Sequence, residues 1–195
     1  MSLVSTLYNF QLLKYAGENG VAAYGVLMYV NLIFLAIFIG YAMGVAPVVS
    51  YHYGASHTEE LQSLLKRSAV IILSASGLMV AFALGLARPL SAVFTGYDEA
   101  LFSLTVRGFG IYAFSFLFSG VAIFGSSFFT ALNNGPVSAL ISFLRTIVFQ
   151  VAAVLLLPLL LGIDGIWYSI VVAELCAALL TLGCLAANRK RYRYF

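Results

Sequence analysis

The sequence predicts an all-α polytopic membrane protein with six transmembrane helices. Of its 195 residues, 63% are hydrophobic and only 9% are charged, against about 25% charged residues in an average soluble domain. Two stretches, residues 19–58 and 108–144, contain no Asp, Glu, Lys or Arg. Because a helix needs about 20 apolar residues to cross the hydrocarbon core, each stretch can span a membrane. A transmembrane β-barrel would instead show short segments of alternating hydrophobicity.

Six crossings and one surface helix account for the chain, which we expect to form a single transmembrane domain over residues 1–195. The first crossing is short for a full span, and three of the others exceed the minimum length, which predicts tilt or extension beyond the bilayer. The predicted crossings cover residues 2–16, 21–50, 68–93, 98–132, 136–161 and 165–188.

The second crossing ends in residues that weaken helices. Gly40 and Gly44 have the spacing of a small-residue face, on which another helix can approach closely. Pro47 removes one backbone hydrogen bond, which predicts a kink near this end of the helix. Gly54 is expected to end the helix.

A short amphipathic segment over residues 58–67 follows. Ser56 and Glu59 have the spacing of a capping box, which predicts a helix start at this point. The segment carries charges at both ends and a narrow apolar stripe, a pattern typical of a helix lying on the membrane surface. The stripe consists of Leu61, Leu64 and Leu65.

The remaining connections have clear turn chemistry. Asp98 is placed to cap the fourth crossing. The run Asn133–Pro136 combines turn residues with a proline that can begin a helix, and Gly162–Gly165 plays the same part before the last crossing.

Basic residues predict the orientation. The net charge is +3, and the tail after the last crossing is basic, as is the 66–67 loop. Six crossings place both of these on one side with both termini, and the positive-inside rule makes that side cytoplasmic. We therefore expect a multi-pass protein of the cell membrane, with the tail as an anchor in contact with lipid and not a nucleic-acid site. The tail residues are Arg189, Lys190, Arg191 and Arg193.

Three charged residues lie deep in predicted crossings and cannot be assigned to loops: Arg107, Arg145 and Glu174. Each lies nine residues from a helix start, which corresponds to a depth of about 14 Å, near the middle of the core. Such charges usually face a bundle interior or a water-filled cavity. Arg145 and Glu174 lie on consecutive antiparallel helices and can form a pair, which is either a structural ion pair or a site that responds to protons or cations. Arg107 has no evident carboxylate partner.

Catalytic and metal-binding patterns are not evident. The sequence has no H-E-x-x-H, paired-Asp or phosphate-loop motif, so we expect neither an enzyme nor a cofactor. His52 and His57 lack a third metal ligand. Cys176 and Cys184 are eight residues apart on one helix, about 12 Å, which is too far for a disulfide.

Six short motifs in order resemble one family, the multidrug and toxic compound extrusion (MATE) transporters. The resemblance rests on G-x-x-x-G-x-x-P-x-x-x-Y-x-x-G-A at residues 40–55, the polar and glycine pattern from Asn9 to Gly25, and Arg107 with Tyr112. It continues through SSFFTALNNG at residues 126–135, Arg145 with Leu157–Pro158 and GIDGIW at residues 162–167, and the acidic Glu174.

Members of that family have two six-helix lobes, and the resemblance covers only the second lobe. It implies one lobe of an antiporter that exports lipophilic or cationic drugs by alternating access, coupled to Na⁺ or H⁺. The chain would then be incomplete, or would pair in parallel with a second copy. The alternatives are a lipid-linked saccharide flippase of the same superfamily and a structural half without transport. Candidate substrate or ion-coupling residues are Glu174, Arg145, Arg107 and Asn9, and candidate packing residues are Gly40, Gly44, Pro47, Gly54 and Pro158.

Overall fold

The computed structural model describes residues 3–192 and residue 194, and every regular element in this part of the chain is helical. Long apolar helices follow one another through short turns, as predicted. In chain order they are α1 (Leu3–Gly54), α2 (Thr58–Thr95), α3 (Glu99–Tyr112), the 3₁₀ segment η1 (Ala113–Ser115), α4 (Phe116–Ala131), α5 (Gly135–Phe143), the π-helical segment η2 (Leu144–Phe149), α6 (Gln150–Leu161) and α7 (Ile163–Tyr192).

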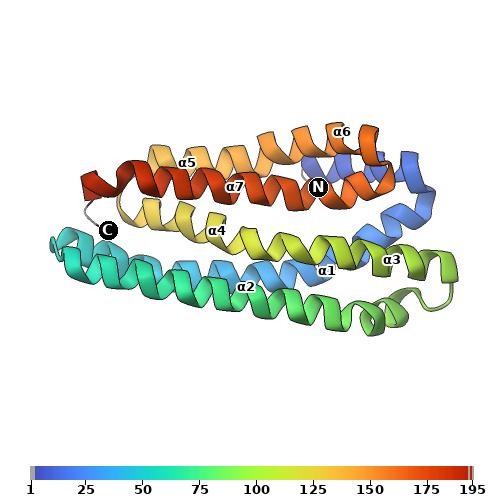
Figure 1. The fold of residues 1–195 in the computed structure, drawn as a ribbon, viewed down its shortest axis with the longest axis horizontal. Helices are drawn as coiled ribbons and strands as arrows, with labels where there is room; N and C mark the ends of the chain where they lie inside the picture. The colour runs from blue at the N-terminus through green and yellow to red at the C-terminus, as the bar shows by residue number, and fades with distance from the viewer. Residues whose placement is uncertain (1–2, 193, 195) are drawn as a thin grey trace.

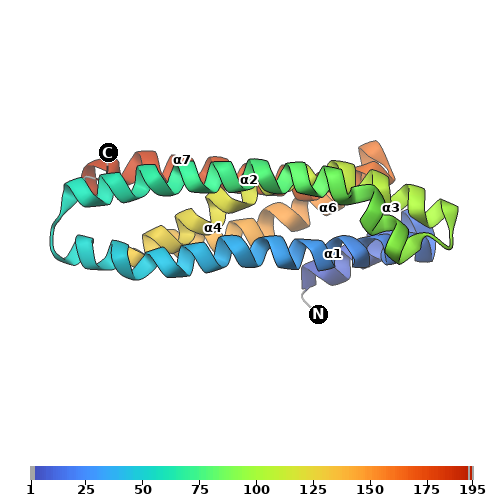
Figure 2. The same cartoon turned by 90° about the horizontal axis from the view of Figure 1, so that it is seen from below.

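The helices form an elongated bundle along one axis (Figure 1). The continuous run of α3, η1 and α4 crosses the middle of the bundle (Figures 1 and 2). The longer second segment of α1 and α2 lie on one side of it, and α5, α6, α7 and the first segment of α1 lie on the other (Figure 1). The residues buried between these helices are largely aromatic and small, and many large apolar side chains on the outside are exposed. Such an exterior fits the hydrocarbon of a bilayer.

The count of spanning helices differs from the prediction. Five described helices are long and apolar enough to cross a membrane, not six. The difference lies in α1, whose 52 residues contain both of the first two predicted crossings. They are separated only at Gly17, where φ is 62° and ψ is −153°. A glycine adopts this backbone conformation without the steric cost of a Cβ, and the chain turns back there at one end of the bundle (Figure 1).

The prediction of a separate surface helix over residues 58–67 is wrong. Helix α2 runs without interruption from Thr58 to Thr95, because its buried stripe continues from Leu61 and Leu65 to Ile72. The predicted capping box between Ser56 and Glu59 is not formed either. Ser56 has a φ of 59°, and the N-cap position is occupied by His57, which makes no capping side-chain bond.

Three other predicted boundaries are confirmed: the helix end at Gly54, the cap at Asp98 and the turn before α5. Helix α1 ends at Gly54. The Asp98 carboxylate accepts hydrogen bonds from the backbone amides of Ala100 and Leu101, at 2.9 and 3.1 Å. At the start of α5, the side chain of Asn134 accepts from the amide of Val137. These bonds satisfy amides that a helix start leaves without partners.

The predicted close approach at Gly40 and Gly44 does not occur within the described chain. A Cβ added at either glycine would meet no atom within 4 Å, because α1 turns its opposite face, with Phe38, Ala42 and Val49, toward the core. Helix α1 continues through Pro47 to its end.

Close helix packing is found elsewhere, at Gly125 and Gly120 of α4. A Cβ at Gly125 would overlap the side chain of Thr181 on α7, and one at Gly120 would lie 2.6 Å from the ring of Phe38. Small residues therefore bring α4 close to α7 and to α1.

Candidate functional site

The predicted contact between Arg145 and Glu174 is confirmed. The Nε atom of Arg145 lies 3.1 Å from one carboxylate oxygen of Glu174 and 2.9 Å from the other. The two side chains are 15% and 5% exposed. A charged pair this buried is stable only when each charge keeps its partner, since either group alone would be a desolvated ion.

Two helical runs near this pair, α3–η1–α4 and α5–η2–α6, depart locally from α-helical geometry. The predicted crossing over 136–161 is divided into α5, η2 and α6, and Arg145 lies in the π-helical η2. The predicted crossing over 98–132 is divided into α3, η1 and α4, with the 3₁₀ turn at Ala113–Ser115. Such local irregularities often accompany functional sites, because they redirect side chains.

A cavity of about 170 Å³, here called the inner cavity, borders the ion pair. Its wall includes both charged side chains, Ser115 of η1 and Ser119 of α4. The Ser119 hydroxyl is buried, and the described residues offer it no hydrogen-bond partner. A cavity with polar walls and an unpartnered hydroxyl can hold water.

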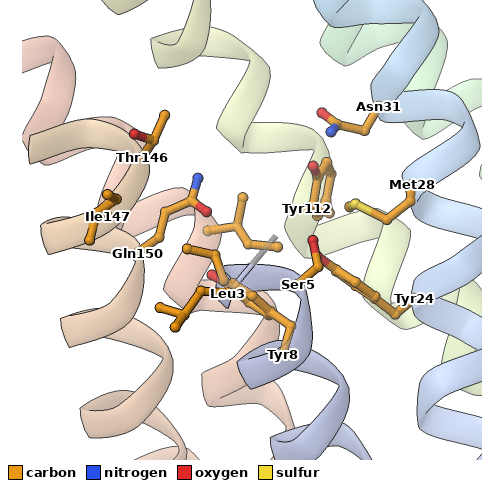
Figure 3. Close-up of a pocket in the computed structure, with 12 residues that line it drawn as sticks. Leu3, Ser5, Tyr8, Tyr24, Met28, Asn31, Tyr112, Thr146, Ile147 and Gln150 are labelled. Atoms are coloured by element: carbon orange, nitrogen blue, oxygen red, sulfur yellow. The ribbon is translucent and has the colours of Figure 1, made fainter. Parts of the chain in front are cut away.

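A larger cavity of about 480 Å³, here called the tyrosine cavity, adjoins it. The two cavities share Asn31, Tyr112, Thr146, Gln150 and Ile170. In Figure 3, Thr146 and Gln150 lie on one side of the tyrosine cavity, and Asn31 lies on the other.

Three tyrosines give this cavity its aromatic character: Tyr8, Tyr24 and Tyr112. The rings of Tyr8 and Tyr24 are stacked, with centroids 5.5 Å apart. The hydroxyl of Tyr8 also lies 2.9 Å from the hydroxyl of Ser169 on α7. The first segment of α1 is therefore held against both the second segment of α1 and α7, and its Tyr8 lines the cavity.

The predictions for Arg107 are wrong in partner and in depth. Its guanidinium forms an ion pair with Asp164, at the start of α7. The Arg107 side chain is 64% exposed, so it does not lie in the bundle interior. The reason is that α3 begins beyond the turn between α6 and α7 (Figure 1), so a residue two turns into α3 lies level with that turn.

Asn9 lies in a different place from the ion pair. It lines a separate pocket together with Phe10, Leu13 and Glu18, between the two segments of α1. The structure thus brings together two of the four candidate site residues, Arg145 and Glu174, and leaves Asn9 and Arg107 elsewhere.

The site contains residues that were not among the candidates. The tyrosines were missed because single aromatic residues are too common in apolar helices to indicate a cavity. The sequence did contain a pattern that could have indicated part of the site. Along α5, η2 and the start of α6, polar residues recur every four positions, at Ser138, Ser142, Thr146 and Gln150. That spacing places polar groups on one face of a helix.

Comparison with known proteins identifies the family. The family model MatE matches residues 1–156. The chain belongs to the MatE family. A comparison with curated protein sequences finds no match.

Solved structures of MATE and MOP superfamily transporters share the fold over nearly the whole chain. One is an outward-facing multidrug resistance MATE transporter of the MOP superfamily (TM-score 0.86, 21% identity, 96% of this chain and 43% of that one). Another is a MOP superfamily transporter from Pyrococcus furiosus whose binding pocket is described as reversed in polarity (TM-score 0.87, 22% identity, 99% of this chain and 43% of that one). A third is the Vibrio cholerae MATE transporter VcmN in its bent form (TM-score 0.83, 21% identity, 98% of this chain and 44% of that one).

This MatE chain spans less than half the length of those structures. The family model ends before α7, which carries Glu174, whereas the structural matches cover 96–99% of the chain. The chain is a multi-pass membrane protein with the fold of one MATE lobe.

Proposed function

We propose that this MatE chain forms one lobe of a membrane transporter that moves lipophilic or cationic molecules by alternating access, coupled to Na⁺ or H⁺. The observation that carries this proposal is the buried pair of Arg145 and Glu174, which lies on the wall of a cavity inside a membrane-spanning bundle.

The pair suits ion coupling because a change in the charge of Glu174 leaves Arg145 as an unpaired, largely buried charge. A single charge at the bilayer centre costs about 2.5–3.5 kcal/mol on insertion scales, whereas the pair is neutral. A proton or a small cation arriving at Glu174 neutralises the carboxylate and releases Arg145. The freed guanidinium then needs a new partner, and this need favours a second conformation of the bundle.

The tyrosine cavity suits the proposed substrate. Ligand pockets commonly measure about 300–1,000 Å³, and this cavity falls within that range at about 480 Å³. Aromatic rings can hold cations through cation–π contacts. Tyr8, Tyr24 and Tyr112 line this cavity, together with the amide side chains of Asn31 and Gln150, which can form hydrogen bonds.

The cavities do not favour the saccharide flippase. An arginine-rich cavity would support that alternative, but the inner cavity has one arginine and one glutamate on its wall. The second lobe would come from a longer gene product or from a second copy of the chain. We place both termini on the cytoplasmic side of the cell membrane, as the positive-inside rule predicts.

Transport by reconstituted protein tests the proposal. Proteoliposomes that contain the full-length gene product should accumulate a fluorescent lipophilic cation when a proton or sodium gradient is imposed. We expect Glu174→Gln to reduce the gradient-driven rate at least tenfold, while the matched control Glu60→Gln, on the exposed start of α2, keeps the normal rate. The absence of gradient-driven uptake by the unaltered protein would contradict the function. Normal uptake by Glu174→Gln would make the ion pair structural.

A further inference from the structure

Five hydroxyl groups form a continuous polar line on the membrane-spanning surface of α4, α5 and η2. We call this line the hydroxyl track, and it consists of Thr130, Ser138, Ser126, Ser142 and Thr146. It begins one residue before the end of α4 and extends beside the chain from α5 into η2.

Hydrogen bonds between hydroxyls connect the track from Thr130 to Ser142, and Thr146 is joined to it through a backbone carbonyl. The hydroxyls of Thr130 and Ser138 are 2.7 Å apart, those of Ser138 and Ser126 are 2.9 Å apart, and those of Ser126 and Ser142 are 2.7 Å apart. The hydroxyl of Thr146 donates to the backbone carbonyl of Ser142 at 2.6 Å. Ser126 is the central link, because it alone bridges Ser138 and Ser142.

The surroundings of the track are apolar. On the same helices, the exposed side chains Leu140, Phe143 and Ile147 point outward, as lipid-facing residues do. Within the track, Thr130, Ser142 and Thr146 are exposed, and Ser126 and Ser138 are half-buried. A connected row of exposed hydroxyls in a spanning segment is typical of a surface that faces water and not hydrocarbon.

The track leads to the ion pair. A cavity of about 360 Å³ is lined by Ser126, Thr130, Ser142, Arg145 and Thr146. Arg145 and Thr146 also line the inner cavity that contains Glu174. The other end of the track lies at the turn between α4 and α5, at the end of the bundle where α1 meets α2 (Figure 1). The two cavities and the hydroxyls therefore connect that end of the molecule with Glu174.

We propose that the hydroxyl track is the route by which protons travel between water at the α4–α5 turn and the carboxylate of Glu174. A hydronium ion gives its proton to the hydroxyl oxygen of Thr130, and each hydroxyl as far as Ser142 passes its own proton to the next hydroxyl oxygen or, from Ser142, to water in the adjoining cavity. Water in the two cavities carries the last transfer. The proton ends on a carboxylate oxygen of Glu174, and one water molecule remains outside.

The groups facing Glu174 leave it as the proton acceptor. Among the described residues they are Arg145 from η2, Tyr8 from α1 and Tyr112 from α3. An arginine does not lose its proton in a protein, and a neutral tyrosine is a poor base. The proposal rests on the proposed function only in naming Glu174 as the acceptor, and it concerns access to that group, not the identity of the substrate.

Cysteine accessibility tests whether the track contacts water, independently of transport. In a background with Cys176 and Cys184 replaced by alanine, we expect Ser142→Cys in proteoliposomes to react with a charged, water-soluble thiol reagent at least tenfold faster than the control Leu140→Cys, which is exposed on the same helix. Equal labelling at the two positions would overturn the proposal, because the track would then face lipid or protein.

Proton delivery is tested by the rate at which Glu174 is protonated after a rapid drop in pH. The infrared band of its protonated carboxyl group reports this step, and the band that disappears in Glu174→Gln identifies it. We expect Ser126→Ala to slow the step at least tenfold with the same final amplitude, and Ser126→Thr to restore it. The matched control Ser103→Ala, which removes an exposed hydroxyl on α3, should leave the rate unchanged.

Two kinetic results would overturn the proposal. One is an unchanged rate in Ser126→Ala. The other is an equal slowing in Ser126→Thr, which keeps the hydroxyl. Failure of the proposed transport function has a different signature, since the labelling and the infrared rate are measured without any substrate and remain informative when no drug is moved.

Discussion

At the scale of single residues, the pair of Arg145 and Glu174 is the feature that most constrains the molecule. Its two side chains come from η2 and α7, and both are largely buried. Removing one member leaves an unpaired charge in a low-dielectric interior, while removing both leaves none. The stability of single and double variants therefore measures how far the pair is structural.

We expect Arg145→Leu to destabilise the protein by about 3–5 kcal/mol. The double variant Arg145→Leu/Glu174→Leu should recover most of that loss, because the desolvated charge disappears with its partner. Reversible unfolding in detergent measures both values. The control Arg107→Leu removes an exposed pair with Asp164 and should cost no more than about 1 kcal/mol. A double variant no more stable than the single one would contradict this argument, because removing the unpaired Glu174 carboxylate would then restore nothing.

At the scale of elements, α4 is the helix about which the bundle is assembled. It packs against α1, α2, α5 and α7, and its glycines allow the closest of these contacts. Gly125 leaves no room for a Cβ beside Thr181, whose side chain is fully buried and donates to the carbonyl of Ala177 at 2.8 Å. The small residue is therefore required by the neighbouring helix.

We expect Gly125→Ala to destabilise the protein by about 1–3 kcal/mol, because the added methyl group forces α4 and α7 apart or displaces Thr181 from its hydrogen bond. Gly40→Ala is the matched control. A Cβ there meets no atom within 4 Å, so alanine should be neutral or stabilising by up to about 1 kcal/mol through its helix propensity. Thermal unfolding of both variants in the same detergent compares them, and equal effects would contradict the packing argument.

At the scale of the whole molecule, the chain has the fold of one lobe and spans about 43% of the related structures. The proposed transport cycle needs a second lobe opposite the first, since alternating access is a movement of one lobe against the other. Predicted cytoplasmic termini allow two copies to pair in parallel, because both would have the same orientation in the membrane.

If a second copy supplies the other lobe, chemical crosslinking in native membranes should give a dimer of twice the mass of the chain. A cysteine at Gly40 is a suitable crosslinking site, because that face of α1 has no neighbour within the described chain. Leu156→Cys, on the exposed surface of α6, is the matched control and should not crosslink. Finding only monomers would contradict pairing between copies.

Much of the fold could be predicted because each spanning segment is determined locally. Apolar length predicted the helices, and Asp98 and Asn134 predicted where two of them begin. The surface helix over 58–67 was mispredicted because charges at its ends suggested a boundary, whereas the buried stripe through Leu61 and Ile72 continues across it. Local sequence cannot show which neighbouring helix covers a stripe.

The candidate site was predicted only in part, for the same reason. Arg145 and Glu174 could be paired because a short turn makes α6 and α7 neighbours, and their depths could be counted along each helix. Arg107 and Asp164 are 57 residues apart in the chain, and nothing in their spacing shows that α3 extends beyond the turn before α7. The tyrosine cavity likewise needs three segments to meet.

The sequence by itself determined the class of protein, the order of its main apolar segments, the family and the pairing of Arg145 with Glu174, because hydrophobic length, turn residues and helical rise act along the chain. Only the tertiary structure decided that Gly17 reverses the chain within α1, that η2 carries Arg145, and that hydroxyls from α4 and α5 form one connected track. These features depend on how separate helices pack against one another. The order of residues along the chain does not show which distant segments come into contact.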